Sequence, residues 1–466
     1  MSFVNLILTL SVNFTFNFAT LSMGKIYLHF FVLLSLFHFN GKAQENNLNQ
    51  GNEDFETATI VTYNLTFYRE TSSFCNGNNN DANVKDAALA KIMGFVNPDI
   101  IVCQEVGSNF TNANKIIENA LNINGVTKWK QGDYSNNGSN LVNQIFYNSE
   151  KFEIYSQTNV SKDLNGNNIV RIIDFYTLFY KDSNLVAGSD TVFLTFIGAH
   201  LKAGNSSSDE NERTQTTAAV MDFIENNDLK GNLFFMGDLN VYDGSEGCFQ
   251  NLINHSNSDY NFYDPVNAIG SWSSNSSFSA YHSQSTRVTS NGCLSGGGMD
   301  DRFDHILITD AVKNNNFGVE YIKNSYKVIG QDGNRFNQSI IFPQNFSVPK
   351  GVDTALYNMS DHLPVKVDLK LKKVPVGISE VSNTNALLSI SNPVGETLTI
   401  FGLSKLPFQN FEYSITDING NLVLKGNFNS SQNQYKIKTT EISSGSYILD
   451  LVSNEKENFN FKFIKP

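Results

Sequence analysis

The sequence predicts an α/β sandwich with mixed sheets, followed by a small all-β sandwich. From residue 57 to residue 371, apolar strand-like runs alternate with amphipathic helical segments, which is typical of sheets covered by helices. From residue 385 to residue 466, the helical spacing gives way to short runs of alternating apolar side chains. Proline, glycine and small polar residues cluster over residues 372–384, which indicates a linker between two domains.

The elements of the first domain follow from the spacing of its apolar residues. Strands are expected where β-branched and aromatic residues form short runs, and helices where apolar residues recur every three or four positions. The predicted strands cover 59–65, 98–106, 142–147, 169–180, 191–200 and 232–237. The predicted helices cover 82–94, 114–121 and 208–226, the last with Ser208 as its N-cap.

The second domain contains only strand signals and no cluster of catalytic residue types. Its predicted strands cover 387–390, 398–400, 413–415, 422–424, 447–451 and 459–464. The sequence Asn-Gly-Asn at 419–421 predicts a hairpin turn.

Residues 1–43 have the features of a secretory signal peptide. Lys25 precedes an apolar run at 26–37, and small residues follow at Gly41 and Ala43. The run is shorter than the roughly 20 residues of a spanning helix, so we expect no stable membrane span after cleavage; a membrane anchor is the alternative. Met23 is an alternative start of the chain, and the polar residues 44–56 are a predicted linker.

Charge and cysteine content restrict the function classes. The net charge is −12, whereas a protein that coats nucleic acid through charge alone would be basic. A polyanionic substrate therefore requires a local cationic site helped by a metal. The four cysteines permit disulfides in an exported protein, although Cys103 lies in an apolar run and is expected to be a buried thiol. The absence of a Cys-x-x-Cys pair disfavours a thiolate zinc site.

Acidic, amide and histidine side chains follow apolar runs at several places in the first domain. These segments are 62–65, 104–106, 198–202, 236–240, and the pair 301–306 with 360–364. Because each polar group is expected at the end of a strand, the segments predict an active site assembled from loops at the rim of the sheets.

In this order the segments closely resemble the signature of the endonuclease/exonuclease/phosphatase superfamily. Members include pancreatic-type deoxyribonucleases, abasic-site endonucleases, inositol polyphosphate phosphatases and sphingomyelinases. The resemblance covers residues 57–371. It implies a four-layer α/β/β/α sandwich of two mixed sheets and a metal-dependent phosphoesterase. Such chemistry uses a hard cation held by oxygen ligands, so Mg²⁺ is the expected cofactor, with Mn²⁺ or Ca²⁺ as alternatives.

The resemblance also implies a role for each matching residue. The implied metal ligands are Asn64, Glu105 and Asp361. Asp238 is expected to orient and deprotonate the attacking water, and Asn240, facing the same way on an extended chain, to hold that water or a phosphate oxygen. His362 is expected to contact the phosphate, oriented by Asp304, and His200 to contact the phosphate or protonate the leaving group.

Cationic side chains in the same segments predict a phosphate-binding wall. They are Lys202, Arg213, Arg287 and Arg302. Ordinary solvated surface charge is the alternative for these residues, and a structural salt bridge between Asp304 and Arg302 is the alternative for that pair.

The second domain resembles a type IX secretion sorting domain. The resemblance rests on segments 392–394, 415–420, 443–448 and 461–466 in this order at the end of the chain. It implies that the type IX secretion machinery of a Gram-negative cell is a partner, and that the protein is secreted or attached to the cell surface. A generic adhesive or carbohydrate-binding module is the alternative.

Three functions remain open from the sequence. An extracellular nuclease acting on DNA, or also on RNA, is the first. A sphingomyelinase-like phospholipase or a phosphomonoesterase of the same superfamily is the second, and a non-catalytic surface adhesin is the third. The complete acid and histidine set counts against the adhesin. The lack of a clear apolar loop favours the nuclease over the phospholipase, while the acidic net charge counts against the nuclease. The oligomeric state is left open.

Overall fold

The computed structural model describes residues 55–133, 135–183, 185, 191–373, 388–407, 409–418, 420–429, 433–455 and 457–466. The predicted signal region, nearly all of the linker 44–56, most of the linker 372–384 and Asn419 lie outside the described residues. The chain divides into two units, one ending at Lys373 and the other beginning at Val374, and each is described by itself.

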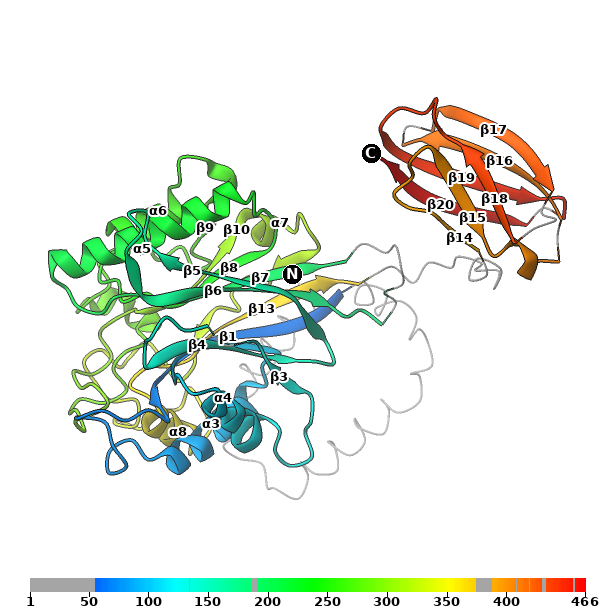
Figure 1. Cartoon of the computed structure of the whole chain (residues 1–466). Helices are drawn as coiled ribbons and strands as arrows, with labels where there is room; N and C mark the ends of the chain where they lie inside the picture. Colours follow the sequence, from blue (N-terminus) through cyan, green and yellow to red (C-terminus); the bar gives the residue numbers. More distant parts are fainter. Residues whose placement is uncertain are drawn as a thin grey trace, which may run out of the picture. The chain divides into compact units, whose positions relative to one another are not determined.

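The first unit contains two mixed sheets packed face to face (Figure 1). One has the order β11-β13-β1-β2-β4-β3, with β12 also paired to β13, and the other has the order β5-β6-β7-β8-β10-β9. The strands of the first sheet are β1 (Phe55–Tyr68), β2 (Ile100–Gly107), β3 (Trp129–Gln131), β4 (Leu141–Asn148), β11 (Val319–Tyr321), β12 (Lys327–Val328) and β13 (Val365–Lys372). Those of the second are β5 (Phe152–Lys162), β6 (Asn168–Tyr180), β7 (Phe193–His200), β8 (Leu233–Asp238), β9 (Phe262–Tyr263) and β10 (Asp304–Thr309).

Helices cover the outer face of each sheet (Figure 1). The helices on the first sheet are α3 (Ala82–Val96), α4 (Phe110–Ile116) and α8 (Val352–Met359). Those on the second are α5 (Ser207–Asn226) and α6 (Gly247–Ile253), and the short α7 (Asp310–Asn314) follows β10. The predicted four-layer α/β/β/α sandwich is therefore confirmed.

The two cores explain why the central strands are apolar on both faces. In β7, Phe196 belongs to the core that the two sheets share, and the next residue, Ile197, belongs to the core beneath α5 and α6. Successive side chains of a strand point to opposite faces, so a strand covered on both sides lacks the polar alternation of a half-exposed one. The central strands thus form a rigid base for the loops at their ends.

Two predicted helices differ in detail from the structure. Helix α5 has Ser206 as its N-cap in place of Ser208, because the Ser206 hydroxyl accepts from Asp209 N and the Asp209 carboxylate accepts from Ser206 N in a capping box. The helix predicted at 114–121 begins earlier, at Phe110, and continues after Ile116 as a π-helical turn over Ile117–Leu121.

A buried carboxyl group lies between the two sheets on β6. Asp174 is 1% exposed, and the side chains of Ser135 and Asn143 lie close to its carboxyl group. Burial raises its pKa from 3.8 to about 7, because the interior disfavours the charged form.

We expect Asp174→Asn to stabilise the protein at alkaline pH. A carboxyl group whose pKa is raised by folding lowers the free energy of unfolding when it is ionised. This loss of free energy is absent below about pH 4, and it grows as the pH rises towards about 7, to about 4 kcal/mol at most. The gain in melting temperature of Asp174→Asn over the parent should therefore be larger at pH 8 than at pH 5. The exposed substitution Asp222→Asn is the control, and an equal gain at both pH values would contradict the prediction.

A disulfide joins two loops of the first unit. Cys75 follows β1, and Cys293 lies 218 residues later in the loop before β10. Asn79 and Asn291 link the same loops through two side-chain hydrogen bonds, of 3.2 and 2.9 Å. Cys103 and Cys248 are buried free thiols, as expected for Cys103; the sequence left the pairing open.

Removal of this disulfide should lower both stability and activity. The double variant Cys75→Ser/Cys293→Ser should lose about 2–5 kcal/mol of unfolding free energy. Ser295, two residues after Cys293, donates through its backbone to the Asp361 carboxylate, so a looser loop should also lower turnover. A reductant should lower the melting temperature of the parent and not that of the double variant, and equal sensitivity of both proteins would contradict this account.

The second unit is a small sandwich of two antiparallel sheets, as predicted. One sheet contains β14 (Ser389–Ile390), β15 (Thr397–Phe401) and β18 (Gln434–Lys438). The other contains β17 (Leu422–Asn429), β16 (Asn410–Asp417), β19 (Gly445–Ser453) and β20 (Asn458–Lys465). Leu398, Ile415 and Phe463 pack together in its core. Within the described part of the chain, no helix has the length and apolar character needed to span a membrane.

Candidate active site

Strand ends from both sheets meet at one edge of the first unit. Strands β7 and β8 are parallel, and their last residues, His200 and Asp238, are paired. Asp304 begins the antiparallel strand β10 directly opposite Asp238. Gly237 makes this approach possible, because its φ is +141° and a Cβ there would lie 1.9 Å from the Ala199 carbonyl oxygen. Only glycine fits at this position.

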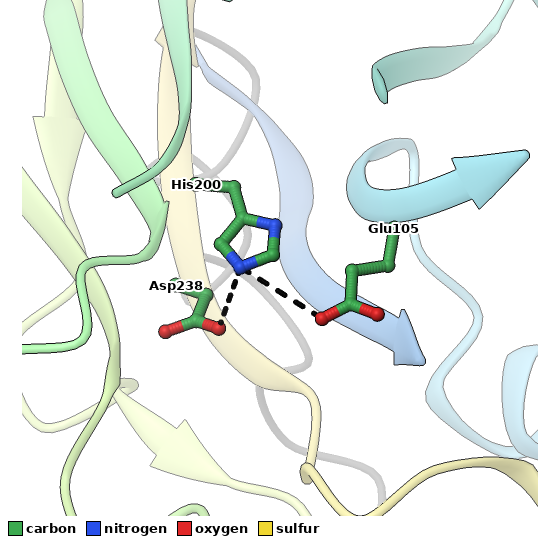
Figure 2. A group of neighbouring side chains, drawn as sticks. All are labelled: Glu105, His200 and Asp238. Carbon is green, nitrogen blue, oxygen red and sulfur yellow. Dashed lines mark ion pairs between the residues drawn. The ribbon is translucent and has the colours of Figure 1, made fainter. Parts of the chain in front are cut away.

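Glu105, His200 and Asp238 point toward one another from β2, β7 and β8 (Figure 2). The Nε2 atom of His200 lies 3.4 Å from Asp238 Oδ2 and 3.7 Å from Glu105 Oε1. Their ligand atoms lie within 4.8 Å of one another. Two carboxylates and an imidazole at this spacing form a donor set that fits a divalent cation. The sequence resemblance placed Glu105 among the metal ligands and assigned the other two residues to catalysis.

Asn64 is in the same cluster, but its amide nitrogen faces the carboxylates. Its Nδ2 donates to Glu105 Oε1 at 3.1 Å and to Asp238 Oδ2 at 2.9 Å. Its Oδ1 accepts from the backbone N–H of Thr66 at 2.9 Å. In this arrangement Asn64 holds the two carboxylates together, and its role as an oxygen ligand of a metal stays a prediction.

The backbone after Asn64 forms an irregular, bulged part of β1 that positions two carboxylates. Thr66 and Phe67 have φ values of 40° and 51°, in the left-handed region that non-glycine residues rarely adopt. The Phe67 N–H donates to Glu105 Oε2 at 3.0 Å, and the Thr66 hydroxyl donates to Asp361 Oδ1. Asp361 also accepts from Ser295 N at 2.9 Å, so this expected metal ligand is held by protein donors.

His362 and Asp304 form a buried pair. His362 Nδ1 lies 2.7 Å from Asp304 Oδ2, which also accepts from the Ser283 hydroxyl at 2.7 Å. The other ring nitrogen, Nε2, lies 3.7 Å from Asp238 Oδ2. This is the arrangement expected of a carboxylate that orients an imidazole. Arg302 pairs with Asp264 instead, so the alternative of an Asp304–Arg302 salt bridge is wrong.

The two histidines have opposite electrostatic environments. Burial would lower the pKa of His362, but the carboxylates of Asp304 and Asp238 outweigh burial and hold that pKa well above its usual value. Burial lowers the pKa of His200 well below its usual value, so its imidazole is neutral. Burial also raises the pKa of Asp238, to about 7. One histidine with a raised pKa, one with a lowered pKa and a carboxyl group with a raised pKa suit acid/base work.

Asn240 does not lie on an extended chain, and this expectation was wrong. Its φ is 49°, so the backbone turns immediately after β8. Its N–H donates to Asp238 Oδ1 at 3.1 Å, and its side-chain amide donates to the Leu201 carbonyl at 3.2 Å. Asn240 therefore fixes the Asp238 carboxylate and the end of β7.

The four predicted cations do not form a phosphate-binding wall. Arg213 is fully buried and bonded to Glu246 at 2.6 Å, and Arg302 is fully buried against both oxygens of Asp264. Because both guanidinium groups are fully buried, neither is accessible to a substrate. These two arginines therefore stabilise the fold through their ion pairs with Glu246 and Asp264, and do not form the predicted phosphate contacts.

The other two predicted cations are also engaged elsewhere. Arg287 is 5% exposed, donates to the Tyr357 carbonyl and lies over the Tyr357 ring at 4.1 Å. Lys202 is partly exposed, but its ammonium group lies 2.6 Å from Asp209 Oδ1. Among the described residues, neither group forms a hydrogen bond or an ion pair with Glu105, His200 or Asp238.

Two residues near the site were missed from the sequence. Lys85 on α3 is 2% exposed and donates to the backbone carbonyls of Leu65 and Thr66, so it supports the bulged part of β1 that positions Glu105. Its spacing to buried Ala88, Leu89 and Ile92 was a usable signal, since these positions share one helix face.

Gln284 is the second missed residue. Its Nε2 lies 2.8 Å from His362 Nε2 and donates to Asp361 Oδ2 at 3.2 Å. It follows no strand-like apolar run, and no signal in the sequence indicated it.

An exposed aromatic loop corrects another expectation. Phe342 and Phe346 are 76% and 81% exposed. The buried guanidinium of Arg335 holds their loop by donating to the carbonyls of Ser339, Pro343 and Gln344. The sequence shows no clear apolar loop because the two phenylalanines are separated by polar residues and proline, and only the ordered loop turns both outward.

Comparison with known families identifies the second unit. Residues 391–465 match the family described as secretion system C-terminal sorting domain. The second unit is a secretion sorting domain. The sorting domain accounts for the lack of a catalytic cluster in the predicted strands of this unit, and its presence indicates that the chain is secreted.

Solved structures resemble the first unit, at low sequence identity. The endonuclease/exonuclease/phosphatase from Bacteroides vulgatus is 16% identical, with 68% of this chain and 100% of that chain covered and a TM-score of 0.42. The human Nocturnin catalytic domain with bound sulfate is 14% identical, with 68% and 97% covered and a TM-score of 0.42. The D. rerio TDP2 complex with a single-strand DNA product is 12% identical, with 67% and 98% covered and a TM-score of 0.41. No curated protein sequence matches the chain.

Proposed function

We propose that the protein is a secreted, divalent-metal-dependent phosphoesterase that hydrolyses phosphodiester bonds, and that it acts as an extracellular nuclease on DNA or RNA. One observation carries the proposal: Glu105, His200, Asp238, Asp304 and His362 come from five separate segments and converge at one edge of the sheets. Burial of a carboxylate is energetically unfavourable unless a partner compensates its charge. The assembly of these carboxylates beside two histidines suits hydrolysis of a charged ester.

The proposed roles follow from the contacts. Glu105 and Asp238, with His200 Nε2, would hold a Mg²⁺ or Mn²⁺ ion, with Ca²⁺ as an alternative. The ion would neutralise charge on the phosphate. Asp238 would also orient and accept a proton from the attacking water, and His362 would donate to a phosphoryl oxygen through Nε2. Asp361 remains a proposed ligand through its free lone pairs or through water.

A second candidate function is favoured by the exposed loop. Phe342 and Phe346 suit contact with a lipid surface, because aromatic side chains partition into the membrane interface. A sphingomyelinase-like phospholipase is therefore the alternative, followed by a phosphomonoesterase. For export, we propose that the sorting domain is recognised by type IX secretion machinery, with release or surface attachment as the outcome.

A substrate panel tests the proposal. Duplex DNA, single-stranded DNA, RNA, sphingomyelin and a phosphomonoester would each be incubated with Mg²⁺, Mn²⁺ or Ca²⁺. We expect hydrolysis of at least one nucleic acid with Mg²⁺ or Mn²⁺. Exclusive hydrolysis of sphingomyelin would favour the phospholipase, and inactivity on every phosphoester would favour a non-catalytic surface protein.

A further inference from the structure

An aromatic pair adjoins Glu105, which belongs to the cluster drawn in Figure 2. The backbone N–H of Phe67 donates to Glu105 Oε2 at 3.0 Å. The Phe67 ring packs against the ring of Phe74 in an edge-to-face pair, with the centroids 5.2 Å apart. Phe67 is half-buried, whereas Phe74 is 51% exposed. An edge-to-face pair uses at most one face of a ring, so Phe74 keeps an aromatic face for another partner.

The loop after β1 holds Phe74 in this exposed position. The Ser72 hydroxyl accepts from the backbone N–H of Phe74 at 3.3 Å, and Asn79 Nδ2 donates to the Phe74 carbonyl at 2.8 Å. The next residue, Cys75, is joined to Cys293 by the disulfide. A side chain that is held in its binding position beforehand loses less conformational entropy when a ligand arrives. The exposed ring is therefore built to receive a ligand at low entropic cost.

The surroundings of Phe74 favour a flat, uncharged ligand. Residues 71–80 contain no charged side chain. The other exposed side chains of this loop carry hydroxyl or amide groups, at Thr71, Ser73, Asn76 and Asn78. A nucleobase has a π-face that stacks on aromatic side chains and polar edges that form hydrogen bonds. A lipid surface would instead require a larger apolar area or cationic side chains, so a nucleobase fits this loop better.

We propose that Phe74 stacks against a nucleobase next to the scissile phosphate, and that this contact makes the site select single-stranded nucleic acid over duplex. The selectivity rests on the proposed nuclease function. A phosphate bound at the cluster has its adjoining nucleoside beside the aromatic pair, because Phe67 connects Glu105 to Phe74. In a duplex, neighbouring base pairs cover both faces of a base, whereas a single strand can turn a base out of the stack. Stacking also binds without positive charge, which suits a chain of net charge −12.

Kinetics on single strands and duplexes test the inference. The full chain and its Phe74 variants would be assayed on a single-stranded oligonucleotide and on the duplex of the same sequence. We expect the parent to prefer the single strand, and Phe74→Ala to raise KM for it by about tenfold with little change in kcat. Phe74→Trp should keep the parental KM. Phe74→Leu should behave like Phe74→Ala, because leucine is apolar but has no ring that can stack.

A matched control separates a local effect from a general one. Phe317 is 57% exposed and precedes β11, which pairs with the end of β13 farthest from His362, so Phe317→Ala should keep parental kinetics. Circular dichroism and melting would confirm that each variant is folded. Parental KM in folded Phe74→Ala or Phe74→Leu, or a parental preference for duplex, would overturn the inference while leaving the phosphoesterase assignment in place. A loss confined to kcat would also overturn it, since Phe74 would then act only by supporting Phe67 and Glu105.

Binding without turnover keeps this failure distinct from failure of the proposed function. Fluorescence anisotropy of a labelled oligonucleotide in excess chelator measures the contact alone, because stacking requires no metal. The parent should bind a normal single strand about tenfold more tightly than an abasic strand of equal length, and Phe74→Ala should bind the two strands equally.

If the parent hydrolyses no nucleic acid, the proposed function fails, and the anisotropy measurement decides the inference alone. Binding by the parent that does not depend on the bases would overturn the stacking contact. Binding of the parent to sphingomyelin vesicles that is lost in Phe74→Ala would overturn it in favour of a lipid surface.

Discussion

Substitution of His362 by alanine should lower turnover by roughly 10²- to 10⁴-fold. His362 Nδ1 is held by Asp304 at 2.7 Å, and Nε2 lies 3.7 Å from Asp238 Oδ2, so one imidazole links the orienting carboxylate to the proposed base. His200→Ala should cause a loss of similar size, because His200 Nε2 approaches the same oxygen of Asp238 to 3.4 Å. Turnover would be measured on a diester substrate or by plasmid nicking.

The pairing of His362 with Asp304 makes a double-variant test decisive. Asp304→Asn should cause a smaller loss than His362→Ala, because it disturbs the orientation and leaves the donor. Adding Asp304→Asn to His362→Ala should then cost little more, since the two residues act as one unit. His255, which lies near Glu225 at 3.8 Å, supplies the control His255→Ala. Parental turnover in folded His362→Ala would reject the assignment.

Removal of the metal should abolish activity, and added Mg²⁺ or Mn²⁺ should restore it. Glu105 offers Oε1 to the cluster while Phe67 N–H fixes Oε2, so Glu105→Gln should keep its shape and lose a charged ligand. We expect the metal concentration for half-maximal activity to rise by about tenfold or more, since loss of a carboxylate weakens binding of a hard cation.

A readout independent of activity completes the test. Binding of Mn²⁺, followed by calorimetry, should weaken in Glu105→Gln and remain parental in Glu153→Gln, a control on β5 whose carboxylate pairs with Lys181 at 3.7 Å. Full activity of the parent in excess chelator would remove the metal from the proposed chemistry.

The charge balance of the site connects these predictions. Burial raises the pKa of Asp238 to about 7, and nearby carboxylates hold the pKa of His362 above its usual value. Both effects arise because acidic groups are crowded in a dry region. The charge of each group thus influences the pKa of the others. Single substitutions are therefore expected to have large and non-additive effects.

Local sequence patterns predicted alternating strands and helices followed by a region of strands alone, whereas the four-layer order and the roles of the site residues came from the resemblance to a known superfamily. Periodicity is local information, so the alternation of strands and helices could be read directly. The positions of Asp238 and His200 at strand ends followed from the apolar runs before them. The sorting domain was recognisable from its motifs and their order at the end of the chain.

Which groups face one another depended on the folded chain. Arg213 and Arg302 looked like substrate contacts because they lie near site segments in the sequence, but their carboxylate partners, Glu246 and Asp264, are 33 and 38 residues away. Gln284 reaches His362 across 78 residues. Partners brought together by long-range packing leave no mark in local spacing, because the free energy that selects them comes from burial and hydrogen bonding in the folded interior.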